Sequence, residues 1–64
     1  MTQRINEKLG AWLIVNNESR ENLAQRIGIS KPTLNKRISG ESEWKWQEVI
    51  AISQLTGTPL DELA

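Results

Sequence analysis

Few residues in this sequence are of types that perform catalysis or bind metals. The chain has no His and no Cys, so the usual zinc ligands, the commonest general base and a thiolate nucleophile are all missing. Eight Asp and Glu residues remain, but no Gly-rich phosphate loop accompanies them, and 64 residues leave little room for a catalytic cleft. We therefore expect no enzyme, no metal site, no cofactor and no small-molecule substrate.

The basic side chains are more informative because they are unevenly distributed. Eight Lys and Arg balance eight Asp and Glu, and a net charge of zero argues at first against a nucleic-acid partner. Residues 20–40, however, carry five basic residues and one acidic residue, whereas residues 41–64 carry one basic and five acidic residues. The middle third is thus a basic block, which indicates either a nucleic-acid partner or a dipolar protein with a solvated face.

The spacing of apolar residues predicts an all-α chain. Ile5, Leu9, Trp12 and Leu13 form one stripe of an amphipathic helix over residues 3–15, with Thr2 as its N-cap. Capping residues and terminating glycines predict further helices at residues 20–27, between Ser30 and Gly40, and at about 46–56. The residues Thr58-Pro59-Leu60-Asp61 predict the capped start of a short fifth helix that carries Leu60 and Leu63. No stretch alternates with period two, so we expect no strands and a single domain over residues 1–64.

The second and third predicted helices are joined by Gly28-Ile29-Ser30 alone. Two short helices on such a turn must cross steeply, and a glycine lets the chain reverse with positive φ. On the third helix, Leu34 and Ile38 define the inner face, so Lys36 points outward. The outer face then offers donors and short polar groups that suit base edges, although an ordinary solvated helix face has the same composition.

These residues resemble a known family. RENLAQRIGISKPTLNKRISG (residues 20–40) is similar to the helix-turn-helix of the Cro and lambda-repressor type (XRE-like) of DNA-binding proteins, with the motif at about 20–38. The loop ending in Trp44 and the later segment GTPLDEL (residues 57–63) resemble the rest of that compact five-helix domain, in an arrangement often found in phage-encoded members.

The resemblance implies a recognition helix that lies in the major groove of DNA. The positions matching base-contacting residues of the family are Lys31, Pro32, Thr33, Asn35 and Lys36. Those matching phosphate contacts, Arg20 most clearly, are Arg20, Ser30, Arg37, Ser39 and Lys45. The family often has a Glu at position 38 that pairs with an Arg on the first helix. Here we expect an apolar contact between Ile38 and Leu13 instead, which leaves Arg37 freer to reach DNA.

The three Trp residues and Ile14 bear on assembly. We expect Trp12 and Trp44 in the core, Trp46 partly buried and Ile14 exposed. Ile14 and Trp46 are candidates for an oligomer interface, because exposed apolar side chains often mark contact patches. Singly exposed apolar residues are also normal, so this pattern alone does not decide between the two.

The sequence leaves two functions open. The first is a cytoplasmic, sequence-specific transcriptional regulator, Cro-like or repressor-like, that binds double-stranded DNA as a weak homodimer on a palindromic operator. The second is a protein-interaction module on the same fold, such as an antirepressor, whose acidic last third meets another regulator. The longest apolar run, residues 11–15, is too short for a membrane span, and we expect neither a signal peptide nor a membrane partner.

Overall fold

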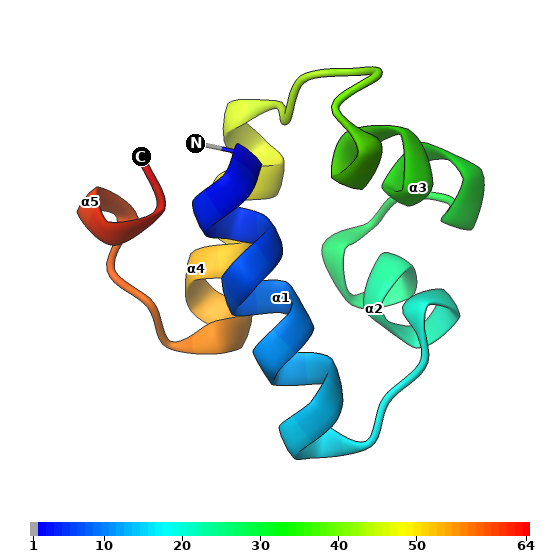
Figure 1. Ribbon diagram of the computed structural model, residues 1–64, viewed down its shortest axis with the longest axis horizontal. Helices are drawn as coiled ribbons and strands as arrows, with labels where there is room; N and C mark the ends of the chain where they lie inside the picture. Colours follow the sequence, from blue (N-terminus) through cyan, green and yellow to red (C-terminus); the bar gives the residue numbers. More distant parts are fainter. Residues whose placement is uncertain (1) are drawn as a thin grey trace.

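The structure is a computed structural model that describes residues 2–64, and within them it is all-α (Figure 1). The five helices, in chain order, are α1 (Thr2–Asn16), α2 (Arg20–Ile27), α3 (Lys31–Ser39), α4 (Trp46–Thr56) and α5 (Leu60–Leu63). In the view of Figure 1, α2 and α3 lie to the right of α1, and α4 and α5 lie to its left. The predicted fold class and the number of helices are confirmed.

Local capping explains most helix boundaries. Ser19 and Ser30 precede α2 and α3, and their hydroxyls accept hydrogen bonds from the backbone N–H of Asn22 and of Thr33. These bonds satisfy donors that the first turn of a helix otherwise leaves unpaired. The prediction of Thr2 as an N-cap is wrong, because Thr2 is already the first helical residue of α1.

One hydrophobic core joins all five helices. The fully buried side chains include Ile5 and Leu9 of α1, Leu23 of α2 and Leu34 of α3. The rest of the core consists of Ala24, Ile27, Trp44, Val49, Ile52 and Leu63. α1 packs against α3, α4 and α5, while α2 packs against α3 and α4. The helix pair α2–α3 is therefore supported by contacts with α1 and α4.

The C-terminal half of α1 is less buried than its apolar stripe predicts. Trp12 and Leu13 pack against the edge of the core and are only partly buried. The guanidinium of Arg26 lies over the Trp12 ring, 5.8 Å from its centroid, which is within the range of a cation–π contact. The prediction for Trp44, in contrast, is confirmed, since this side chain is 7% exposed.

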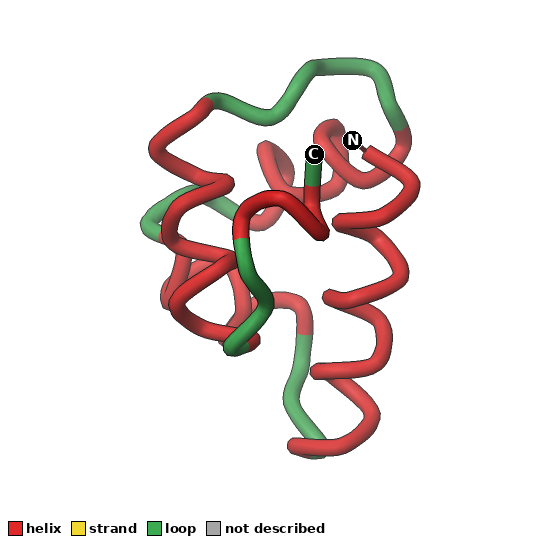
Figure 2. The backbone as a smooth tube through the Cα atoms, turned by 90° about the vertical axis from the view of Figure 1, so that its left-hand side faces the viewer, coloured by secondary structure: helices red, strands yellow, loops and turns green. Residues whose placement is uncertain are grey.

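The large exposed apolar side chains belong to three helices: Ile14 and Val15 to α1, Trp46 to α4 and Leu60 to α5. Ile14 is 82% exposed, as predicted, but Trp46 is 56% exposed, so the prediction of a partly buried Trp46 is wrong. Ile14 belongs to the last turn of α1 and Trp46 is the first residue of α4. These two helix ends, the end of α1 and the beginning of α4, lie at opposite ends of the molecule in both views (Figures 1 and 2).

Candidate nucleic-acid interface

The turn between α2 and α3 is built by local backbone bonds. Gly28 has φ 90° and ψ 27°, a left-handed conformation that L-residues with a Cβ rarely adopt. The Gly28 N–H donates to the carbonyl of Ala24 at 2.9 Å, and the Ile29 N–H donates to the same carbonyl at 3.0 Å. Ala24 is buried and Ile29 is partly buried, so the turn is anchored in the core. The chain therefore reverses at once and presents α3 beside α2.

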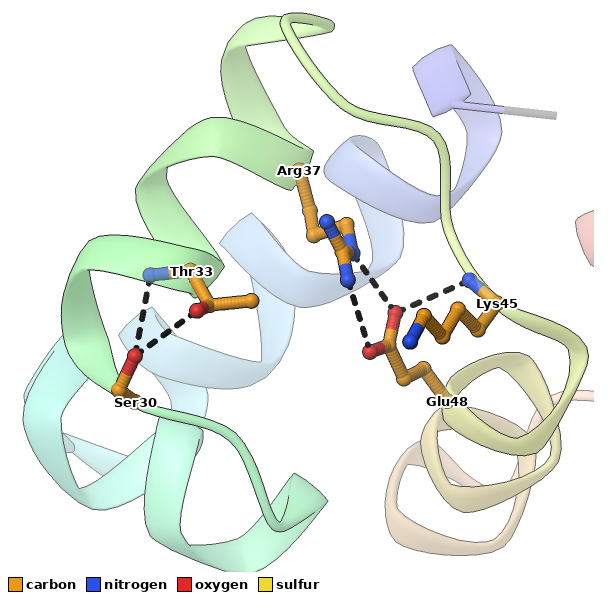
Figure 3. Close-up of polar contacts among 5 residues, drawn as sticks. All are labelled: Ser30, Thr33, Arg37, Lys45 and Glu48. Atoms are coloured by element: carbon orange, nitrogen blue, oxygen red, sulfur yellow. Dashed lines mark hydrogen bonds and ion pairs between the residues drawn. The ribbon is translucent and has the colours of Figure 1, made fainter.

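Ser30 caps the N-terminal end of α3 through hydrogen bonds with Thr33 (Figure 3). The Ser30 hydroxyl donates to Thr33 Oγ1 at 2.8 Å and accepts from the Thr33 N–H at 3.3 Å. Pro32 lies in the first turn of α3, where a backbone N–H would have no partner within the helix, so the N–H that proline lacks is not needed. Ser30 and Thr33 are thus engaged with one another in the free protein, and Thr33 is partly buried.

The outward face of α3 carries four of the five predicted base-contacting residues. Lys31, Pro32, Asn35 and Lys36 are all exposed, and only Thr33 lies at the edge of this face. We call these four residues the outer face of α3. The phase of the helix is therefore close to the predicted one, and it sets ammonium and amide donors beside the apolar ring of proline.

Arg37 is the exception, and the prediction that it is free to reach DNA is wrong. Its side chain points inward, and its Nε donates to Glu48 Oε1 at 2.9 Å while its Nη2 donates to Glu48 Oε2 at 3.3 Å (Figure 3). The two side chains are 11% and 9% exposed. A bidentate pair of this kind commits the guanidinium fork to the carboxylate. Arg37 thus faces the molecule and not solvent, because the inner face of α3 runs along Leu34 and Arg37, with Ile38 only partly buried.

Glu48 also accepts a hydrogen bond from the backbone of Lys45, which connects the loop before α4 to the Arg37–Glu48 pair. The Lys45 backbone N–H donates to Glu48 Oε1 at 3.0 Å, which forms part of the capping box that opens α4. Burial by itself raises the pKa of the Glu48 carboxyl, but the hydrogen bonds from Arg37 and from the Lys45 backbone, with the charges of both residues, lower that pKa below its ordinary value. The pKa of Arg37 is raised, chiefly by its hydrogen bond to Glu48. Both groups are therefore charged at neutral pH.

The C-terminal end of α3 is held as well. Asn6 of α1 donates from Nδ2 to the Ile38 carbonyl at 2.8 Å, and the Ser42 N–H donates to the Lys36 carbonyl at 3.1 Å. These bonds satisfy carbonyls that a helix leaves unpaired at its end. With the Arg37–Glu48 pair, they fix α3 to α1 and α4 and leave its outer face open.

The remaining predicted phosphate contacts lie around this face. Arg20 and Lys45 are exposed and stand at the beginnings of α2 and α4. Arg20 Nη1 donates to Asn35 Oδ1 at 3.0 Å, which links α2 to the outer face of α3. Ser39 is exposed and its hydroxyl donates to the Lys36 carbonyl at 3.1 Å. Because Glu48 neutralises Arg37, the effective charge of residues 20–40 falls from plus four to plus three.

The reasoning from sequence missed Glu48. Its position carries a usable signal, because Glu48 lies four residues before the buried Ile52 and therefore falls on the inward side of α4. Arg37 lies three residues after Leu34 and faces inward for the same reason. Two oppositely charged residues on facing inner stripes indicate an ion pair.

Other kinds of site find little support among the described residues. Nowhere in residues 2–64 do three His, Cys, Asp or Glu side chains gather in a way that could hold a metal ion. No helix from Thr2 onward combines the length and the apolar character that a bilayer span requires. A hollow of about 320 Å³ exists, but its described lining comes from α1, the end of α4 and the turn after it: Lys8, Ala11, Trp12, Val15, Asn16, Thr56 and Thr58.

Comparison with known proteins gives one match. A family model described as helix-turn-helix covers residues 18–63, which includes α2, the turn, α3, α4 and α5. No curated protein and no solved structure matches the chain. The family match confirms the resemblance that the sequence carries.

Proposed function

The chain belongs to the helix-turn-helix family of DNA-binding regulators, and we propose that it is a sequence-specific transcriptional regulator that inserts α3 into the major groove of double-stranded DNA. The observation that carries this proposal is the outer face of α3. It sets Lys31, Asn35 and Lys36 toward solvent, while Leu34 and Arg37 hold the other side of the helix in place. A rigid helix with an open donor face suits the edges of base pairs.

The chemistry of the outer face suggests what it reads. The ammonium groups of Lys31 and Lys36 can donate to guanine O6 and N7, and the Asn35 amide can pair with adenine. The ring of Pro32, or the methyl group of Thr33, can contact the thymine methyl. We assign base contacts to these five residues.

We assign phosphate contacts to the basic side chains near α3 that are not paired with any acidic residue that the structure describes. Arg20 and Lys45 flank α3 from the beginnings of α2 and α4, and the hydroxyls of Ser30 and Ser39 can add weaker contacts. Such contacts position the protein on the duplex without reading sequence. Arg37 has a different role, because its pairing with Glu48 connects the inner side of α3 to α4.

The finer role is a Cro-like or repressor-like regulator. It acts in the cytoplasm as one domain over residues 1–64, and it binds a palindromic operator as a weak homodimer. Two copies of α3 would then enter successive major grooves about 34–36 Å apart. The proposed role is binding alone, with no catalysis.

A second candidate is an interaction module on the same fold, such as an antirepressor. Ile14 and Val15 are each 82% exposed at the end of α1, and residues 41–64 are acidic. Exposed apolar residues and a charged surface both suit a protein partner.

One experiment separates the two candidates. Duplexes selected by the protein from a random pool, at fixed moderate salt, should converge on a palindrome if the regulator proposal is right. Affinity for the recovered duplex should fall linearly in log salt concentration, with a slope of about −0.9 for each phosphate neutralised. An unenriched pool, with no binding to any duplex at low salt, would favour the interaction module.

A further inference from the structure

The hydrogen bond from Arg20 to Asn35 joins the two helices of the motif on their exposed side. Arg20 is the first residue of α2, and Asn35 is the fifth residue of α3. Their Nη1 and Oδ1 atoms are 3.0 Å apart, and both side chains are exposed. Within residues 2–64, no other hydrogen bond connects a side chain of α2 with a side chain of α3. The contact therefore lies where DNA would lie under the proposed function.

This bond distinguishes the two ends of the Asn35 amide. An asparagine amide accepts hydrogen bonds through its oxygen and donates two through its nitrogen. Because Oδ1 accepts from the Arg20 guanidinium, the amide nitrogen is the end that is left to donate to another group. The oxygen still has a second lone pair, so it can accept one further bond in this orientation.

The orientation matters for base reading. An amide that leads with its nitrogen can donate to the N7 of a purine, and its oxygen can accept from the exocyclic amine of adenine. An amide turned by half a rotation would lead with its oxygen, which suits the N4 amine of cytosine. A side chain free to turn would accept both patterns and would discriminate poorly between them.

We propose that Arg20 is a specificity-determining residue that fixes the Asn35 amide in its donor-leading orientation, so that Asn35 favours a purine over cytosine at the base it reads. This inference rests on the proposed function. One of the five guanidinium N–H donors holds Asn35, and the others remain free for phosphate. Arg20 thereby couples the position of the backbone to the reading of one base.

Lysine is the informative replacement, because it keeps the positive charge but lacks the planar fork that can hold an amide and a phosphate together. The probe is the duplex that wild-type protein recovers from the random pool. Comparison with Asn35→Ala identifies the base pair that Asn35 reads, as the position at which the preference disappears. Arg20→Lys is then measured on four duplexes that differ only at that pair. Arg26→Lys is the matched control, since Arg26 lies on the same helix over Trp12.

We expect Arg20→Lys to reduce the preference for purine over cytosine at that pair by about fivefold or more, because a good amide–base contact accounts for about 1–3 kcal/mol of discrimination. Preferences at other positions, the salt slope and the melting temperature should stay unchanged. In an Asn35→Ala background, Arg20→Lys should have no further effect on discrimination at that pair. Arg26→Lys should behave like the wild type.

Several results would overturn the inference. Arg20→Lys could match the wild type, lower the affinity for all four duplexes equally, or change base preference as much without Asn35 as with it. An Asn35→Ala variant that keeps every base preference would also overturn it. If wild-type protein binds no duplex, the proposed function fails and the inference fails with it. If wild-type protein binds selectively and Arg20→Lys does not alter the Asn35 position, only the inference fails.

Discussion

Arg37 of α3 and Glu48 of α4 form a bidentate ion pair on the inner side of the helix that we assign to DNA reading. The two N–O distances are 2.9 Å and 3.3 Å, and Glu48 also accepts from the Lys45 backbone N–H at 3.0 Å. One carboxylate thus connects α3, the loop before α4 and the first turn of α4. The position of α3 depends on this group, and its charge depends on pH.

The first prediction concerns Glu48→Gln and pH. The pKa of Glu48 is lowered in the folded protein, so its carboxylate stabilises the fold fully above the ordinary pKa of glutamate, about 4.3. That stabilisation is lost as the pH falls through the folded pKa. Glutamine can still accept from the Lys45 N–H but carries no charge. We expect Glu48→Gln to lower the melting temperature on the order of 5 °C at neutral pH.

The difference between the two proteins should shrink as the pH falls below the ordinary pKa of glutamate, about 4.3, and should be smallest below the folded pKa of Glu48. Thermal unfolding followed by circular dichroism across this range measures it. Arg37 stays protonated throughout, because its pKa is raised. A difference that stays constant from neutral to acid pH would contradict a stabilising role for the Glu48 charge.

The second prediction concerns the turn at Gly28. A Cβ built on Gly28 would meet no atom within 4 Å, so the cost of Gly28→Ala is the cost of a left-handed alanine backbone, about 1–2 kcal/mol. Gly10 is the matched control, since its Cβ would also be unobstructed but its backbone is helical. Gly10→Ala should stabilise the protein by about 0.5–1 kcal/mol. Chemical denaturation measures both, and shifts of the same sign would contradict this account of the turn.

Features that depend on interactions between neighbours in the sequence were predictable, whereas contacts between distant residues were not. Caps, terminating glycines and apolar spacing are local, so the five helices were predictable within one or two residues. The exposed donors of α3 follow from the same spacing, because Leu34 fixes the phase of the helix. The ion pair between Arg37 and Glu48 joins two helices through residues 11 positions apart. The apolar spacing of each helix predicts that its charged residue faces inward, but which two side chains meet depends on how the helices are placed in the fold. The bond from Arg20 to Asn35 is missed for the same reason.

The third prediction concerns phosphate contacts. Lys45 is exposed at the beginning of α4, and we propose that it neutralises one phosphate. Lys45→Gln should then weaken binding about equally for all DNA sequences and reduce the magnitude of the salt slope by about one. Lys8→Gln is the control, since Lys8 lines the hollow beside Trp12. Fluorescence anisotropy at several salt concentrations gives the slopes. Equal slopes for Lys45→Gln and the wild type would remove Lys45 from the interface.

The most direct test of the central claim is the affinity of an Asn35→Ala, Lys36→Ala double variant for the duplex that wild-type protein selects. Both side chains are exposed, so the fold should keep its melting temperature. A Lys8→Ala, Asn16→Ala variant is the control, because it removes the same two side-chain types from the hollow on α1.

If α3 reads the bases, the double variant should bind the selected duplex about a hundredfold more weakly than the wild type and lose its preference for that duplex over random DNA. The control variant should keep both the affinity and the preference. Wild-type affinity and unchanged base preference in the Asn35→Ala, Lys36→Ala variant would contradict the claim that the outer face of α3 reads DNA.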